Sequence, residues 1–172
     1  MFRICGVLAG LLIALPGGIE GFTGETAVTS MLIALSPALA FPALVGLWTT
    51  HVRGRFGLIA FCANLIGLGL FGGAAFTLNI ALFFNAAEPA APTRLALLGT
   101  AVVFAAGSVL FGIALIRSAT APKPPAWAYP AALPAFALLA PLPDSPLTSA
   151  LHVVVGGTLV WLSTTVRDPV TA

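Results

Sequence analysis

The stretch GLIAFCANLIGLGLFGGAAFTLNIALFF, residues 57–84, contains no Asp, Glu, Lys or Arg. A hydrocarbon core is crossed by roughly 20 apolar residues in a helix, and an uncharged run of about 18 or more predicts a membrane span. This run is longer, so it can cross the bilayer with some tilt or with an overhanging end. The preceding residues 51–55, HVRGR, form the densest basic cluster of the chain. An apolar segment that follows a basic cluster predicts a membrane span whose basic end lies in the cytoplasm.

The composition of the whole chain is that of a membrane protein. Of 172 residues, 59% are hydrophobic and only 7% are charged, whereas a soluble domain carries about 25% charged residues. Seven basic and five acidic side chains are too few to cover a water-facing surface. We therefore predict a single transmembrane domain over residues 1–172. The small net charge of +2 gives no indication of nucleic-acid binding, so the expected surroundings are the lipid bilayer.

Six apolar segments separated by polar or proline-rich turns predict an all-α fold, a polytopic transmembrane helical bundle. The expected spans are residues 4–22, 28–50, 57–84, 94–116, 126–142 and 147–165. The first segment could also be a cleaved signal peptide, but its apolar character continues through Ile19 and Phe22, so we expect a retained helix. The fifth contains Pro130, Pro134 and Pro141 and is either a kinked span or a re-entrant segment. The charge pattern favours a span.

The basic residues set the orientation of the six spans. Alternating loops place most of them on one side, namely Arg3, Arg53, Arg55, Arg117, Lys123 and Arg167. The other side receives Arg94, together with Glu20, Glu25, Glu88 and Asp144. An excess of Lys and Arg marks the cytoplasmic side of a membrane. We therefore predict a multi-pass protein of the bacterial inner membrane with both termini in the cytoplasm.

Pairs of glycines predict where helices approach each other closely. In lipid, helices associate through close packing, and small residues four positions apart allow it. Gly6 and Gly10 form such a pair in the first segment, and Gly69 and Gly73 form one in the third. We expect these faces to contact neighbouring helices, a membrane protein partner or a second copy of the chain. The third segment is the expected centre of the bundle.

Four polar side chains in the apolar segments are candidates for a ligand site or a polar path. Asn64 and Asn79 are fifteen residues apart, which leaves them about 60° apart around a helix, so both should face the bundle interior. They either line a path or join helices by hydrogen bonds, and the second interpretation is favoured. Glu20 ends the first segment and His152 lies in the sixth. If those helices are neighbours, the two side chains could form a pair that responds to pH through the imidazole.

The simpler interpretation of Glu20 and His152 is a carboxylate among headgroups and a histidine bonded to its own helix. No sequence pattern predicts an enzyme, a metal site or a cofactor, because HExxH, CxxCH, GxSxG and P-loop patterns do not occur. His51 and His152 should lie on opposite sides of the bilayer, so one haem cannot take both. Cys5 and Cys62 lack metal-ligand spacing, and we expect both to fill helix contacts.

The segment FGIALIRSATAPKPPAWAYPAALPAF, residues 111–136, is followed by LHVVVGGTLVWL, residues 151–162. This arginine-ended helix, proline–tryptophan restart and glycine-rich last helix resemble uncharacterised small multi-pass membrane proteins of high-GC bacteria. The resemblance implies a multi-pass fold and supplies no functional residues. We expect a structural, accessory or small-ligand-binding membrane subunit that is not an enzyme. The alternative is a small transporter or channel for a neutral or lipid-like solute, with a path along Asn64 and Asn79.

Overall fold

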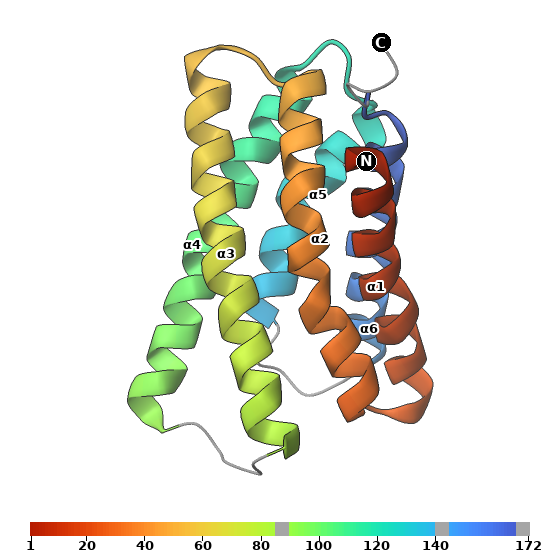
Figure 1. The fold of residues 1–172 in the computed structure, drawn as a ribbon, viewed down its shortest axis with the longest axis vertical. Coiled ribbons are helices and arrows are strands. Elements are labelled where there is room, and N and C mark those ends of the chain that lie inside the picture. The colour runs from red at the N-terminus through yellow and green to blue at the C-terminus, as the bar shows by residue number, and fades with distance from the viewer. Residues whose placement is uncertain (85–89, 140–144, 168–172) are drawn as a thin grey trace.

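The computed structural model describes residues 1–84, 90–139 and 145–167, and all regular secondary structure in these ranges is helical. This confirms the all-α prediction for the described residues. Their six helices are α1 (Phe2–Thr23), α2 (Ala27–His51), α3 (Gly54–Phe84), α4 (Ala91–Arg117), α5 (Lys123–Leu139) and α6 (Pro146–Thr164) (Figure 1). Each begins within a few residues of its predicted start. Residues 140–142 of the predicted fifth span lie outside the described residues.

Five of the described helices, α1, α2, α3, α4 and α6, are long and apolar enough to cross a membrane. This finding indicates a membrane protein. The remaining helix, α5, has 17 residues, which at 1.5 Å per residue is about 25 Å and shorter than a hydrocarbon core of about 30 Å. The count of six spans and the location of both termini in the cytoplasm stay predictions.

Hydroxyl side chains fix the starts of α2 and α6. Thr26 Oγ1 accepts a hydrogen bond from the Thr29 amide, and the Thr26 amide donates to Thr29 Oγ1. Ser145 and Thr148 form the same reciprocal pair. Such capping boxes satisfy amide groups that have no acceptor within the helix. Both lie at the end of the bundle opposite the chain termini (Figure 1), where they position the first turns of α2 and α6.

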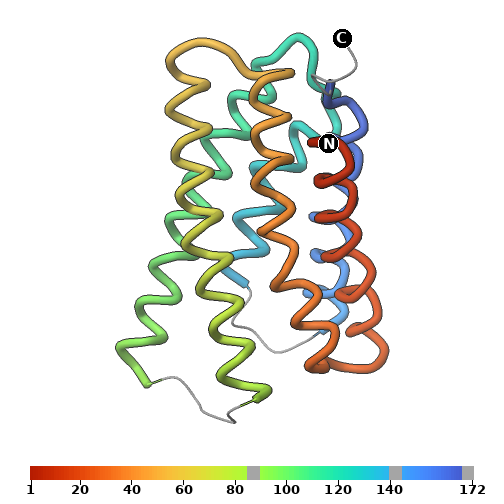
Figure 2. The backbone as a smooth tube through the Cα atoms, in the orientation of Figure 1, coloured from red at the N-terminus to blue at the C-terminus, as the bar shows by residue number. Residues whose placement is uncertain are grey.

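The six helices form a closed ring (Figure 2). Each helix packs against its neighbours in sequence, and α1 packs against α6 to complete the ring. The α1–α6 and α3–α4 interfaces are the most extensive, whereas α2–α3 and α5–α6 are smaller. The bundle therefore consists of two three-helix groups, α6–α1–α2 and α3–α4–α5. In this ring α3 lies between α2 and α4 and does not occupy the bundle centre that the sequence analysis expected.

Glycines allow α1 and α6 to approach with their backbones nearly in contact. A Cβ atom on Gly10 would lie 2.5 Å from the Gly156 carbonyl oxygen, and a Cβ on Gly156 would overlap the Gly10 carbonyl oxygen. Gly6 faces Ser163 so closely that a Cβ there would overlap the serine hydroxyl. The pair predicted in the first segment therefore lies at the contact that closes the ring.

The close contact between α3 and α4 uses other glycines than the predicted pair. A Cβ on Gly67 would lie 2.5 Å from Phe104 Cα, and one on Gly107 would lie 2.6 Å from Asn64 Cα. In contrast, a Cβ on Gly69 would only touch the Phe41 ring at 3.3 Å, and one on Gly73 would meet no atom within 4 Å. The backbone approach is thus made by Gly67 and Gly107. Cys62 of α3 is exposed, so it does not fill a helix contact as expected.

His51 joins three segments at the end of the bundle that carries the termini. Its Nε2 lies 2.9 Å from Thr165 Oγ1, and its Nδ1 lies 3.0 Å from Thr120 Oγ1. Because Thr165 Oγ1 donates to the Leu162 carbonyl, it accepts from His51 Nε2–H, and a neutral imidazole then accepts from Thr120 at Nδ1. With the fully buried Phe111 packed nearby against the Tyr129 ring, these contacts close this end of the bundle.

Candidate functional site

A cavity of about 630 Å³ lies between the two three-helix groups, at the end of the bundle opposite the termini. All six helices contribute residues to its wall, from Glu20 near the end of α1 to His152 in the second turn of α6. Small-molecule sites in proteins have volumes of roughly 300–1,000 Å³ and mostly apolar walls with a few polar groups. The cavity has the size and composition of such a site.

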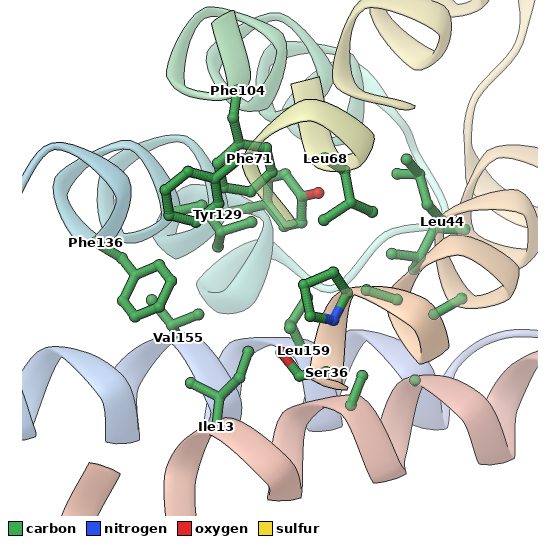
Figure 3. Close-up of a pocket in the computed structure, with 17 residues that line it drawn as sticks. Ile13, Ser36, Leu44, Leu68, Phe71, Phe104, Tyr129, Phe136, Val155 and Leu159 are labelled. Carbon is green, nitrogen blue, oxygen red and sulfur yellow. The ribbon is translucent and has the colours of Figure 1, made fainter. Parts of the chain in front are cut away.

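Aromatic side chains form the inner wall of the cavity. The Phe71 ring stacks on Phe104 with 5.1 Å between centroids, and Phe136 meets Phe71 edge-on at 6.2 Å. A second, smaller cavity of about 50 Å³ with an apolar lining lies next to these rings, on their side toward the chain termini (Figure 3). Ser36, Pro37, Phe71 and Phe136 line both spaces. The large cavity and this narrow apolar chamber therefore adjoin at the aromatic cluster.

The structure brings Glu20 and His152 to the same cavity. They lie on the neighbouring helices α1 and α6, and the Glu20 side chain is only 5% exposed. His152 Nδ1 donates to the Thr148 carbonyl at 2.7 Å, and its ring meets Phe136 edge-on at 5.0 Å. A Cβ on Gly17 would overlap the His152 ring, so α1 holds this imidazole against the cavity wall.

The two asparagines of α3 lie in different surroundings. Asn79 lines the cavity, and its Nδ2 donates to the Ser30 carbonyl of α2 at 2.9 Å. Asn64 is 1% exposed and does not line the cavity. It donates from Nδ2 to the Tyr129 hydroxyl at 2.6 Å and accepts at Oδ1 from Ser108 at 3.0 Å. Asn64 therefore connects α3, α4 and α5 through hydrogen bonds. Asn79 lines the same cavity as Glu20 and His152.

Sequence reasoning did not select Ser36, Glu25 or Arg94 as site residues, yet all three line the cavity. Ser36 lies in α2 and is only 3% exposed. The one signal in the sequence is its position before Pro37, because proline disturbs the helix and can redirect the preceding side chain. Glu25 lies in the turn between α1 and α2, and Arg94 lies in the first turn of α4, near a helix end where charged residues are ordinary.

A site shared by the two histidines is excluded by their positions. His51 contacts Thr165, which follows His152 by thirteen residues, a rise of about 20 Å along a helix. One metal ion or haem iron cannot bind both rings. Within residues 1–84, 90–139 and 145–167, no three His, Cys, Asp or Glu side chains are grouped to hold a metal ion.

The arrangement at the cavity is suited to binding. It combines apolar walls with carboxylates, an imidazole, an amide and hydroxyl groups around one cavity. The chain matches no protein-family model, no curated protein and no solved structure. The cavity is therefore the structural basis for a proposal of its function.

Proposed function

We propose that the protein is a membrane subunit that binds a small ligand in the cavity between its two three-helix groups. The observation that carries this proposal is the cavity of about 630 Å³ to which all six helices contribute. The proposal includes six spans, a bacterial inner membrane and cytoplasmic termini, in keeping with the excess of Lys and Arg at that end. The cavity then faces away from the cytoplasm. A binding or accessory role requires no chemistry from the chain itself.

Reporter fusions test the proposed layout in the membrane. A reporter joined after Lys123 is expected in the cytoplasm, and one joined after Asp144 is expected on the opposite side, because α5 crosses the bilayer between them. The readout is a pair of fusion enzymes, each active in only one of the two compartments. Finding both fusion points in the same compartment would contradict the crossing by α5, and with it the count of six spans.

Filling the cavity tests ligand binding. Ala74 lies in α3 and lines the cavity, so Ala74→Trp places an indole in the space that a ligand would occupy. We expect the amount of bound small molecule to fall at least tenfold. The measurement is native mass spectrometry of the full chain purified in a mild detergent, which reports any mass that stays attached to the folded protein.

The matched control for Ala74→Trp is Ala106→Trp. Ala106 is exposed on α4 and does not line the cavity, so the same substitution there leaves the cavity open. Wild type and Ala106→Trp should carry the same bound mass. Equal retention of ligand by Ala74→Trp, in protein that is still folded, would show that the ligand does not occupy this cavity.

A second candidate function is a small transporter for a neutral or lipid-like solute. One observation favours it: the cavity lies where the two three-helix groups meet through their smaller interfaces. Transport would require these groups to separate at the opposite end, where the His51–Thr120 contact joins α2 to the segment between α4 and α5. Solute flux in proteoliposomes distinguishes the two functions, since a binding subunit holds its ligand without moving it across the bilayer.

A further inference from the structure

Three hydroxyl groups of the cavity wall donate their hydrogens to acceptors within the protein. A hydroxyl has one hydrogen to donate and two lone pairs that accept. Once the hydrogen is used, the group can offer a ligand only its oxygen as an acceptor. The pairs are Ser30 with Glu25 Oε1 at 2.7 Å, Thr100 with the Leu97 carbonyl at 2.7 Å, and Thr148 with the Ser145 carbonyl at 2.8 Å.

The imidazole and amide at the cavity also present acceptors. His152 uses Nδ1–H on the Thr148 carbonyl, which leaves Nε2 of the neutral ring as an acceptor. Asn79 uses Nδ2 on the Ser30 carbonyl, and its Oδ1 makes no hydrogen bond with the residues that the structure describes. A ligand that meets this wall is recognised through its own N–H or O–H donors.

The charges at this end of the bundle are mainly negative. Glu20 and Glu25 line the cavity, and Arg94 is the one Lys or Arg among the described lining residues. A cleft whose charges have one predominant sign concentrates ligands of the opposite sign. The cavity therefore favours cations.

Ser36 adds a polar group deep in the cavity. Its side chain is 97% buried and faces both the large cavity and the apolar chamber (Figure 3). A serine hydroxyl can accept a hydrogen bond as well as donate one. Pro37 next to it has no N–H, so the carbonyl of Ile33, another lining residue, loses its usual helical donor. Both groups can bind a ligand donor.

We infer that the ligand is a lipophilic cation, an apolar body that carries a protonated amine. The ammonium N–H groups match the acceptors on the wall, and the positive charge matches Glu20 and Glu25. The apolar body matches the inner wall, which Phe71 and Phe136 line. This inference rests on the proposed binding function and specifies the chemical class of its ligand.

Three probes with one shared cage test the charge preference. They are 1-aminoadamantane, which is a cation at pH 7, 1-adamantanol, which is neutral, and 1-adamantanecarboxylate, which is an anion. Each is titrated into the full chain in detergent micelles while the midpoint of thermal unfolding is recorded, because a ligand that binds the folded state raises this midpoint. We expect the amine to bind at least tenfold more tightly than the alcohol and the carboxylate to give no shift.

The outcomes separate this inference from the proposed function. If the alcohol or the carboxylate binds as tightly as the amine, the preference for cations is overturned while ligand binding in the cavity stands. If none of the three probes shifts the midpoint, the inference is also overturned. In that case, the retention of ligand by wild type and by Ala74→Trp decides the proposed function independently.

Substitutions at the wall locate the bound amine. Glu20→Gln and Glu25→Gln should each weaken its binding about tenfold, since each removes one negative charge. Ser36→Ala should weaken it severalfold. The matched control is Ser163→Ala, because Ser163 is a similarly buried serine, 1% exposed, that does not line the cavity. Unchanged amine binding in folded Glu20→Gln, Glu25→Gln and Ser36→Ala would overturn the assignment.

Discussion

Replacing Gly156 with alanine is expected to lower the free energy of unfolding by about 3 kcal/mol, the upper part of the range for an overpacked contact. The added methyl group would overlap the Gly10 carbonyl oxygen and would lie 2.6 Å from Ala14 Cβ. A backbone oxygen cannot rotate away as a flexible side chain can, so α1 and α6 must move apart. Because their interface completes the ring, the loss should appear as a large fall in the midpoint of thermal unfolding, followed by circular dichroism in detergent.

The neighbouring residue provides the control. A Cβ on Gly157 would meet no atom within 4 Å, and alanine is favoured over glycine in a helix by up to about 1 kcal/mol. Gly157→Ala should therefore unfold at the wild-type temperature or above it. If both variants unfold at the same temperature, the close approach of α1 and α6 does not stabilise the bundle.

Asn64→Leu is the substitution with the second-largest expected effect, a loss of about 2 kcal/mol in the free energy of unfolding. Interhelical hydrogen bonds in membrane proteins contribute roughly 0.6 kcal/mol each, and leaving a buried polar group without a partner adds about 1–3 kcal/mol. Leucine has a similar size but removes the partner of both the Tyr129 and the Ser108 hydroxyl. Chemical or thermal unfolding in detergent measures the change.

A triple variant checks that unpaired groups cause this loss. Combining Asn64→Leu with Tyr129→Phe and Ser108→Ala removes every member of the network, and replacing all partners by apolar groups can be nearly neutral. The triple variant should recover most of the stability that Asn64→Leu loses. Wild-type stability of the single variant would show instead that these hydrogen bonds do not hold α3, α4 and α5 together.

The helices were predictable because their signals are local. An uncharged run of sufficient length has no alternative to a helix in lipid, where every backbone group needs an internal partner. The hydroxyls of Thr26 and Ser145 then mark two helix starts through contacts only three residues away. Such features depend on neighbouring residues and not on how the helices are arranged.

The ring and its contact faces were less predictable, since they depend on how each helix is rotated. Apart from a few polar residues, Asn64 and Asn79 among them, α3 is apolar on all sides, so its sequence does not indicate which of its glycines contacts a neighbouring helix. The spacing of Gly69 and Gly73 drew attention to one face, but Gly67, about 160° away from Gly69 at 100° per residue, makes the close contact with α4. The backbone of Phe104 that it meets comes from a distant part of the chain.

The candidate site was predictable only in part, because the sequence does not show at which level of the bundle each residue lies. Asn64 and Asn79 point to similar sides of α3, but fifteen residues separate them by about 22 Å along the helix. One therefore lies in the closed core and the other at the cavity. Glu20 and His152 share a cavity because α1 packs against α6, a condition that the sequence analysis stated but could not establish. The role of Ser36 depends on Pro37 and on side chains from the other helices that line the same cavities.

Unequal helix lengths give this protein a dependence on the tail length of the surrounding lipids. α3 has 31 residues and α6 has 19, so at 1.5 Å per residue they are about 46 Å and 29 Å long. The shorter one matches a hydrocarbon layer of about 30 Å, whereas the longer one must incline or stretch the lipid around it. Because α3 and α6 belong to opposite three-helix groups, short-tailed lipids incline one group more than the other. The shape of the space between the groups, and with it the affinity for its ligand, should follow the lipid composition.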